Sequence, residues 1–292
     1  MDESSEGAAE VIMVRHWLTM PSVRLLCVST TTAMIDSLVP PTCLLCGELV
    51  CESRFCALCE TALTQTWPPA AVACRFCAMP RPREPAESLD ERCNLCKSTR
   101  YGFDEVIALA IYQGAVREAV VASKLARHYP LATALGQLLG NHVRARLAPH
   151  SALLLSSGAD SPPTPMPHDI VTYVPTHFLR RIHRKGLSGA AAIASEVGER
   201  LELPAVPLLR MTRAAKKQSM LLDAERPANV RGAFAIKKRY ARVRPDGLKG
   251  LNILLVDDVL TTGSTASEIA RVLKDAGAGK VTLAVVARAV RR

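Results

Sequence analysis

Eight of the ten cysteines in this chain fall into four Cys-x-x-Cys pairs, and this spacing limits what the surrounding segment can fold into. A Cys-x-x-Cys turn presents two sulfurs on one side of a tetrahedron, so two turns supply the four soft ligands that Zn²⁺ prefers. Four pairs therefore predict two structural zinc sites, neither with an open position for a substrate. The predicted ligands are Cys43, Cys46, Cys56, Cys59, Cys74, Cys77, Cys93 and Cys96.

The order in which the pairs combine stays open. Sequential pairing closes each zinc ribbon locally, whereas a cross-braced arrangement joins the first pair to the third and the second to the fourth. Disulfides or ordinary buried thiols are the alternative to metal, and the regular spacing disfavours them. Because metal-bound thiolates require a reducing compartment, the cysteines also predict a cytoplasmic protein.

From Phe103 onward, apolar strands alternate with amphipathic helices. Such alternation predicts an α/β fold, in which helices flank a mostly parallel sheet. Residues 210–231 lie between a predicted helix at 189–201 and a predicted strand at 252–256, and they are expected to form a basic connector. Strands are expected at 106–112, 170–174, 252–256 and 281–286, and helices at 115–125, 131–147, 189–201 and 265–276.

Two further segments lack a helical or strand period. Residues 1–38 begin with an acidic stretch and are expected to form a disordered or weakly ordered extension. Residues 151–168 are rich in Ser, Gly, Pro and Thr, which predicts a loop insertion. The apolar stretch before residue 39 is interrupted by Arg24 and Asp36, so no membrane span is expected.

A phosphate site is predicted at the end of the apolar run 253–256. Asp257 and Asp258 follow this run, at the edge where open parallel sheets bind ligands. Two carboxylates at that edge can accept hydrogen bonds from the vicinal hydroxyls of a ribose. Next, Thr261, Thr262, Gly263, Ser264 and Thr265 offer hydroxyls, a flexible glycine and the first amides of a helix. Together they predict a nest for a monoester phosphate, about one ribose away from the acidic pair.

The charge of the chain also favours a phosphate-bearing partner. The net charge is +10, and the stretch from Pro175 to Lys249 holds 17 Lys and Arg against 6 Asp and Glu. Such a region attracts phosphates, whether of a small molecule or of a nucleic acid. Aromatic residues make up only 4% of the chain, which disfavours a surface that stacks bases.

The cysteine pairs and the phosphate loop together resemble the ComF family, whose members join a double zinc ribbon to a type I phosphoribosyltransferase fold. The resemblance implies a double zinc ribbon at 39–100 and a phosphoribosyltransferase-like domain at 101–292. Besides the cysteines and the phosphate loop, it rests on residues 39–47, Lys124, Val174-Pro175, Gln218 to Leu221, Arg226, Asn229 and Gly232-Ala233-Phe234.

The resemblance further implies a pocket for phosphoribosyl pyrophosphate, with Asp257 and Asp258 on the ribose and residues 261–265 around the 5′-phosphate. The turn after an earlier strand would hold the pyrophosphate, which places Pro175, Thr176, His177 and Arg180 there. Magnesium would be bound largely by the substrate itself. One departure is that an Arg-Gly-Phe-Asn-Gln stretch of the family is replaced by Lys-Gly-Leu-Ser-Gly at 185–189.

Two functional hypotheses follow. The leading one is a phosphoribosyltransferase that binds phosphoribosyl pyrophosphate and Mg²⁺, then transfers or releases ribose 5-phosphate with pyrophosphate as the leaving group. The alternative is a non-catalytic accessory protein of the competence or DNA-uptake type. In that case the chain handles single-stranded DNA or contacts DNA-processing proteins, and the pocket senses a nucleotide.

Overall fold

The structure, a computed structural model, describes a large part of the chain. The expected extension at 1–38 lies outside the described residues, as do residues 151–165 of the expected loop insertion. The described residues are 40–51, 53–65, 73–81, 92–125, 128–147, 166–175, 189–213, 230–238, 240 and 247–290.

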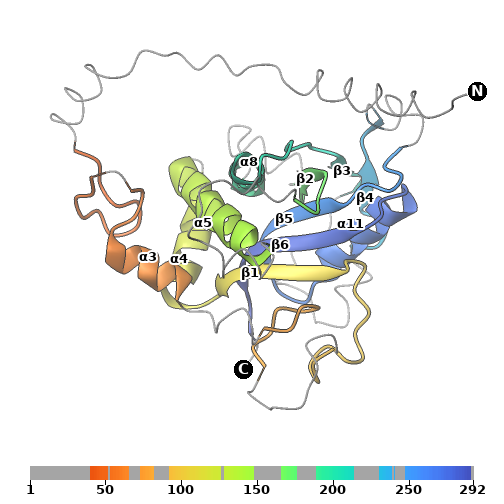
Figure 1. Cartoon of the computed structure of the whole chain (residues 1–292), viewed down its shortest axis with the longest axis horizontal. Coiled ribbons are helices and arrows are strands. Elements are labelled where there is room, and N and C mark those ends of the chain that lie inside the picture. Colours follow the sequence, from red (N-terminus) through yellow and green to blue (C-terminus); the bar gives the residue numbers. More distant parts are fainter. Residues whose placement is uncertain are drawn as a thin grey trace, which may run out of the picture.

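A four-stranded parallel sheet forms the centre of the molecule, in the order β1-β6-β5-β2 (Figure 1). Its strands are β1 (Glu105–Ile111), β2 (Ile170–Tyr173), β5 (Ile253–Leu260) and β6 (Val281–Arg288). The first four residues of β5 and all of β6 are buried, as expected for central strands covered on both faces. The predicted α/β fold with a parallel sheet flanked by helices is confirmed.

Side chains of the central strands alternate between two hydrophobic cores, because successive residues of a strand face opposite sides of the sheet. Leu254 and Val256 lie in the core under α4 (Gly114–Ser123), α5 (Tyr129–Leu147) and α8 (Gly189–Leu201). Ile253 and Leu255 lie in the core under α11 (Ser264–Asp275). Among the described helices, none is both long and apolar enough to cross a membrane.

Strand β5 is longer than expected, and this corrects the prediction that the strand stops at residue 256. Its parallel ladder with β6 continues through Asp257, paired with Val285, to Leu260, paired with Arg288. Because β6 also runs two residues beyond its predicted end, it offers backbone partners to the part of β5 that follows Val256. The two aspartates therefore belong to the last part of the strand instead of following it.

The predicted connector at 210–231 is also corrected in part. It begins inside β3 (Leu209–Met211), which pairs antiparallel with β4 (Phe234–Ile236) over the face that α11 covers. Both strands have three residues, which is too short for a periodic pattern to be visible in the sequence. Residues 214–229 lie outside the described part of the chain.

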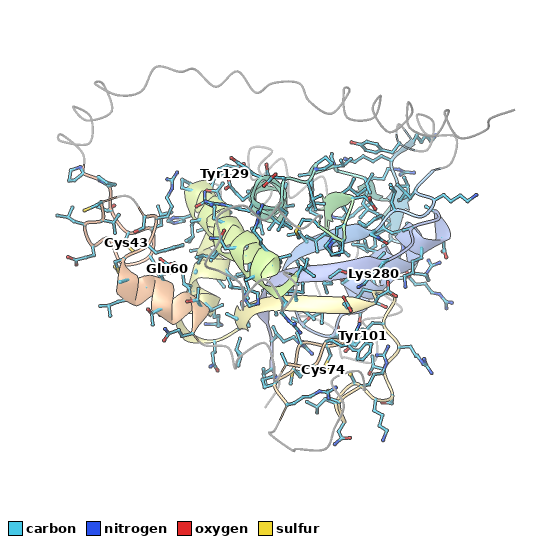
Figure 2. All side chains as sticks on the ribbon, viewed as in Figure 1. Cys43, Glu60, Cys74, Tyr101, Tyr129 and Lys280 are labelled. Carbon is cyan, nitrogen blue, oxygen red and sulfur yellow. The ribbon has the colours of Figure 1, made fainter. Side chains whose placement is uncertain are left out.

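The two cysteine regions lie at separate places around the sheet (Figure 2). The first, with Cys43, Phe55 and α3 (Ala57–Thr64), packs into the core shared with α4 and α5. The second lies along the free edge of β1, where the Val106 N–H donates to the Arg75 carbonyl at 2.8 Å. This contact covers an edge strand whose backbone groups would otherwise be exposed.

Close packing of α5 on α8 depends on Gly136. A Cβ atom there would lie 2.8 Å from the Ile193 carbonyl oxygen and 2.9 Å from its Cα. We expect Gly136→Ala to lower the free energy of unfolding by about 1–3 kcal/mol, because overpacking outweighs the better helix propensity of alanine. Denaturant unfolding measures this. Gly189→Ala is the matched control, since its nearest contact would be an ordinary 3.4 Å; equal stability of both variants and the wild type would contradict the packing argument.

Candidate functional site

The second cysteine cluster has the geometry of a closed zinc site. The sulfurs of Cys74, Cys77, Cys93 and Cys96 all lie within 4.8 Å of one another, and all four residues are buried. Sulfur–sulfur distances are 3.7 Å for Cys74–Cys96, 3.5 Å for Cys77–Cys93 and 3.7 Å for Cys93–Cys96. A tetrahedron with Zn–S bonds of about 2.3 Å has edges of about 3.8 Å, so these residues fit Zn²⁺.

The first cluster joins Cys43, Cys46, Cys56 and Cys59, again within 4.8 Å. Cys46 and Cys56 lie 3.7 Å apart, but here Cys46 is exposed and Cys43 alone is buried. Sequential pairing of the four Cys-x-x-Cys turns is therefore confirmed over a cross-braced arrangement. Cys51 is exposed and outside both clusters, and Cys27 lies outside the described residues.

Electrostatics of the second cluster call for a cation. Contact with Cys77 lowers the pKa of the Cys74 thiol, and the same contact raises the pKa of Cys77. Four thiolates this close cannot all ionise unless a metal ion offsets their charge, and a bound Zn²⁺ does so. Four sulfurs fill the tetrahedron and leave no open position, so both clusters fit structural Zn²⁺.

The predicted phosphate loop connects β5 to α11 through Thr261, Thr262 and Gly263. Gly263 is the N-cap of α11 and has a φ of +81°, a conformation that favours glycine. Its carbonyl accepts the Ser267 N–H at 2.8 Å, and the Thr262 and Ser264 hydroxyls lie 3.0 Å apart. The first amides of the helix and two hydroxyls thus gather at one point, as an anion nest requires.

A second constraint keeps this position a glycine. A Cβ on Gly263 would lie 2.8 Å from Cε1 of Tyr101. Tyr101 stacks on Phe103 with ring centroids 4.7 Å apart, and it also packs against the second cysteine cluster. Figure 2 shows Tyr101 and Cys74 on the same side of β1. The phosphate loop therefore packs directly on the ring of Tyr101, which follows the last cysteine of the second zinc ribbon.

The acidic pair is built around one lysine. Asp257 Oδ1 accepts the Asp258 N–H at 2.9 Å, and Asp258 Oδ2 forms a 2.8 Å ion pair with Lys124 Nζ. Lys124 is the C-cap of α4, the helix that follows β1. Lys124 is one of the residues on which the resemblance to the ComF family rests. Nothing in the sequence assigned it this contact, because 133 residues separate it from Asp257.

Charges in this group offset one another. Burial, reinforced by the charge of Asp258, raises the pKa of Asp257 to about 8. Burial opposes the charged form of Lys124, but the attraction of Asp258 outweighs it and raises the pKa of the ammonium group. At neutral pH, Asp257 is therefore largely protonated and Asp258 is paired, so the three side chains together carry little net charge.

Of the four residues predicted for pyrophosphate, the structure describes Pro175. It follows β2, whose Tyr173 pairs with Val256, and the Val174 N–H donates to the Val256 carbonyl at 3.1 Å. Pro175 therefore lies at the same sheet edge as Asp257. Thr176, His177 and Arg180 lie outside the described residues, as do residues 185–188 of the departure from the family pattern; Gly189 begins α8.

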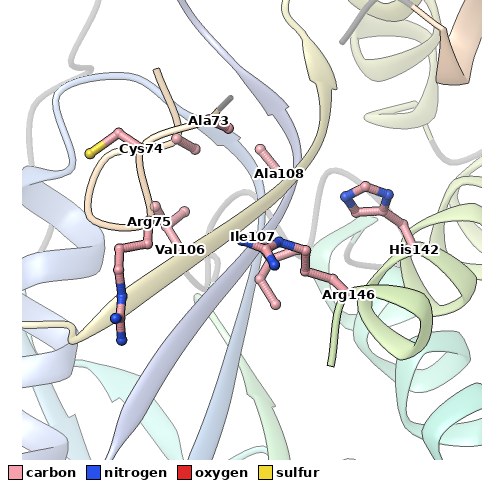
Figure 3. A pocket seen from close by; sticks show the side chains of 9 residues that line it. Ala73, Cys74, Arg75, Val106, Ile107, Ala108, His142 and Arg146 are labelled. Atoms are coloured by element: carbon pink, nitrogen blue, oxygen red, sulfur yellow. The ribbon is translucent and has the colours of Figure 1, made fainter. Parts of the chain in front are cut away.

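Two hollows elsewhere on the described surface do not match a nucleotide site. Figure 3 shows the first, between the Cys74 knuckle, β1 and α5, with His142 and Arg146 beside it. Its volume of about 20 Å³ holds about one water molecule. The second, about 560 Å³, is an open polar groove between α5 and α8, where Arg144 already pairs with Glu202.

Comparisons with known proteins agree with this arrangement. A family model for the phosphoribosyl transferase domain matches residues 182–292, which include the phosphate loop. Residues 182–292 thus match a phosphoribosyl transferase domain. The chain is 26% identical over 248 residues to the DNA utilization protein YhgH of Salmonella typhi, covering 83% of this chain and 95% of that protein. It is 23% identical over 200 residues to competence protein F of Haemophilus influenzae, covering 68% and 79% of the two chains.

The chain is thus homologous to DNA utilization and competence proteins, and the resemblance to the ComF family is confirmed. Among solved structures, glutamine phosphoribosylpyrophosphate amidotransferase from B. subtilis is 19% identical and aligns with 53% of this chain and 26% of its own. Its TM-score is 0.30, too low to carry an argument about the site.

Two closed thiolate sites predict about two zinc ions per chain in protein purified under reducing conditions. Metal analysis measures this. Cys93→Ser should lose one ion, because three ligands hold zinc less tightly, whereas Cys51→Ser should keep both since Cys51 is outside the clusters. Absence of metal, or intact disulfides in the purified protein, would rule out the zinc assignment.

The raised pKa of Asp257 predicts how stability depends on pH. Because the folded-state pKa of about 8 exceeds the ordinary 3.8, the folded protein holds this proton more tightly than the unfolded chain. Its stabilising contribution is full below pH 3.8 and is lost as the pH rises through about 8. We expect Asp257→Asn, which cannot ionise, to remove this slope from unfolding free energies measured from about pH 5 to about pH 9. Asp275→Asn, at an exposed position on α11, should retain it; parallel curves for all three proteins would contradict the shift.

Proposed function

We propose that this protein binds phosphoribosyl pyrophosphate with Mg²⁺ and transfers or releases ribose 5-phosphate, with pyrophosphate as the leaving group. The observation that carries the proposal is the continuity of β5, the phosphate loop and α11. One uninterrupted stretch presents the acidic pair, then Gly263 in a left-handed conformation, then the start of a helix. A ribose 5-phosphate offers a vicinal diol for the acidic pair and a monoester phosphate for the loop.

Recognition of the diol falls to Asp257 and Asp258. A protonated Asp257 can donate one hydrogen bond and accept another, while Asp258 accepts only. Lys124 is proposed to support binding by offsetting charge, because phosphoribosyl pyrophosphate carries several negative charges. Its ion pair with Asp258 reduces the repulsion that two free carboxylates would exert on such a ligand.

Recognition of the 5′-phosphate falls to residues 261–265. The hydroxyls of Thr262 and Ser264 lie beside each other, and the amides at the start of α11 carry the positive end of the helix dipole. Thr261 and Thr265 are further predicted contacts. Charge-assisted hydrogen bonds of this type are stronger than neutral ones, so the loop contributes the main part of the affinity.

Transfer of the ribose-phosphate requires stabilisation of the departing diphosphate while the ribose carbon becomes cation-like. Mg²⁺, bound largely by the substrate itself, would supply positive charge to the leaving group. From the chain itself, Pro175, Thr176, His177 and Arg180 are proposed to hold the diphosphate. Zinc-bound thiolates also support a cytoplasmic location, because they require a reducing compartment.

A second candidate is an accessory role in handling single-stranded DNA, with the pocket as a nucleotide sensor. The relatives named for DNA utilization and competence support it, together with the net charge of +10. Low aromatic content weighs against it, because sequence-tolerant binding of single strands relies on stacking.

Replacing Asp257 and Asp258 together by Asn tests the proposed function. A hydrogen bond to the charged Asp258 is worth roughly 1.5–3 kcal/mol, and the neutral hydrogen bonds of Asp257 add about 1 kcal/mol. Affinity for phosphoribosyl pyrophosphate with Mg²⁺ should therefore fall on the order of a hundredfold. Calorimetric titration measures this. Binding of pyrophosphate alone should change far less, and Asp275→Asn is the matched control.

Unchanged nucleotide affinity in the double variant, together with binding of single-stranded DNA by the wild type, would favour the second candidate. A screen for pyrophosphate release with candidate acceptors then separates an enzyme from a sensor. Release in the wild type that disappears in the double variant is the result expected of a phosphoribosyltransferase.

A further inference from the structure

One buried arginine contacts both the second zinc ribbon and the phosphate loop. Arg288, the last residue of β6, is 7% exposed. Its Nε donates to the Cys77 carbonyl at 2.7 Å, and its Nη1 donates to the Leu260 carbonyl at 2.8 Å and to the Thr261 carbonyl. A single guanidinium thus joins the backbone of a zinc ligand to the backbone of the loop.

These contacts orient the loop amides. In a planar trans peptide, the carbonyl and the N–H of the next residue point in opposite directions. The described residues contain no cis peptide bond. The Leu260 carbonyl also accepts the Ala289 N–H at 2.9 Å, so the chain after β6 helps to hold it. By holding the Thr261 carbonyl on its own side, Arg288 turns the N–H group of Thr262 to the opposite side. The amides of Thr261 and Thr262 precede Gly263 and belong to the predicted anion nest.

The segment after Cys96 makes a second connection. Tyr101 packs against the second cysteine cluster, and its ring occupies the space beside Gly263. The next residue, Gly102, donates its N–H to the Ser267 hydroxyl at 2.7 Å, within the first turn of α11. Displacement of this segment would therefore disturb the loop and the start of the helix together.

We propose that Arg288 is a positioning residue that couples the second zinc site to the phosphate loop, so that the loop holds its phosphate-binding geometry when Cys74, Cys77, Cys93 and Cys96 bind zinc. The consequence for ligand affinity rests on the proposed function, whereas the coupling itself does not. The first zinc site provides an internal comparison, because it lies against α3 and the core under α4, away from Arg288.

Two measurements test this proposal on the full chain. Hydrogen exchange of the amides at 261–267 without ligand reports the loop directly, and titration with ribose 5-phosphate reports its affinity. Arg288→Lys keeps the positive charge. Lysine lacks the planar guanidinium group that donates to the Cys77 carbonyl and to the loop carbonyls at the same time. The variant should keep both zinc ions, accelerate exchange in the loop, and lower the affinity for ribose 5-phosphate by about tenfold.

Matched variants separate coupling from general instability. Cys96→Ser should accelerate loop exchange as Arg288→Lys does, whereas Cys46→Ser, which disrupts the first site, should leave it unchanged. Arg144→Lys is the arginine control, because Arg144 also donates to a carbonyl, that of Arg200, but on the surface; it should alter neither measurement.

The outcomes are distinct. A wild-type protein that does not bind ribose 5-phosphate contradicts the proposed function, and loop exchange still decides the coupling. Unchanged exchange at 261–267 in Arg288→Lys overturns the coupling, as does equal acceleration by Cys46→Ser and Cys96→Ser. If Cys96→Ser fails to fold, exchange in the folded Arg288→Lys protein decides the question.

Discussion

The parallel pairing of β5 with β6 is the constraint on which the rest of the site depends. It carries Asp257 to the ligand-binding edge of the sheet and places Leu260 beside Arg288. Because this ladder continues past the apolar run 253–256, the acidic pair has a backbone fixed on one side by hydrogen bonds. The phosphate loop then starts from a rigid strand and ends in a helix that packs on the same sheet. A site of this kind needs little further ordering when a ligand arrives.

The second zinc ribbon extends this rigid framework at the sheet edge. Besides the contact of Arg75 with β1, the Glu105 carboxylate forms ion pairs with both Arg75 and Lys280. Burial raises the pKa of Glu105, but the two cations outweigh it and hold this pKa below its usual value. Zinc bound to the second cluster would organise a segment with few apolar residues of its own, and that segment contacts Tyr101 and Arg288. Metal ligation would then hold the loop where a hydrophobic core would be too small.

Sequence patterns predicted those features of the structure that depend on residues close together in the chain. Four Cys-x-x-Cys turns, the buried run 253–256 and the turn chemistry around Gly263 each depend on residues close in sequence, and the structure brings them together as expected. Contacts between distant segments were beyond such patterns. The Lys124–Asp258 ion pair and the Arg288 contact with Cys77 depend on how β1, β5 and β6 align, and no spacing rule encodes that alignment. The extension of β5 was missed for the same reason, since residues 257–260 are held in the strand by their pairing with β6.

The chemistry of the acidic pair also bears on the two candidate functions. A carboxyl pair that recognises a vicinal diol selects ribose, because deoxyribose lacks the 2′-hydroxyl. The backbone of DNA would offer this pair no diol, and the charge of Asp258 would disfavour a phosphate in the same place. A role in DNA handling would therefore use a surface other than the acidic pair, and the basic stretch from Pro175 to Lys249 has the charge for it. The two functions are then compatible within one chain, with a ribose-phosphate in the pocket and a polyanion outside it.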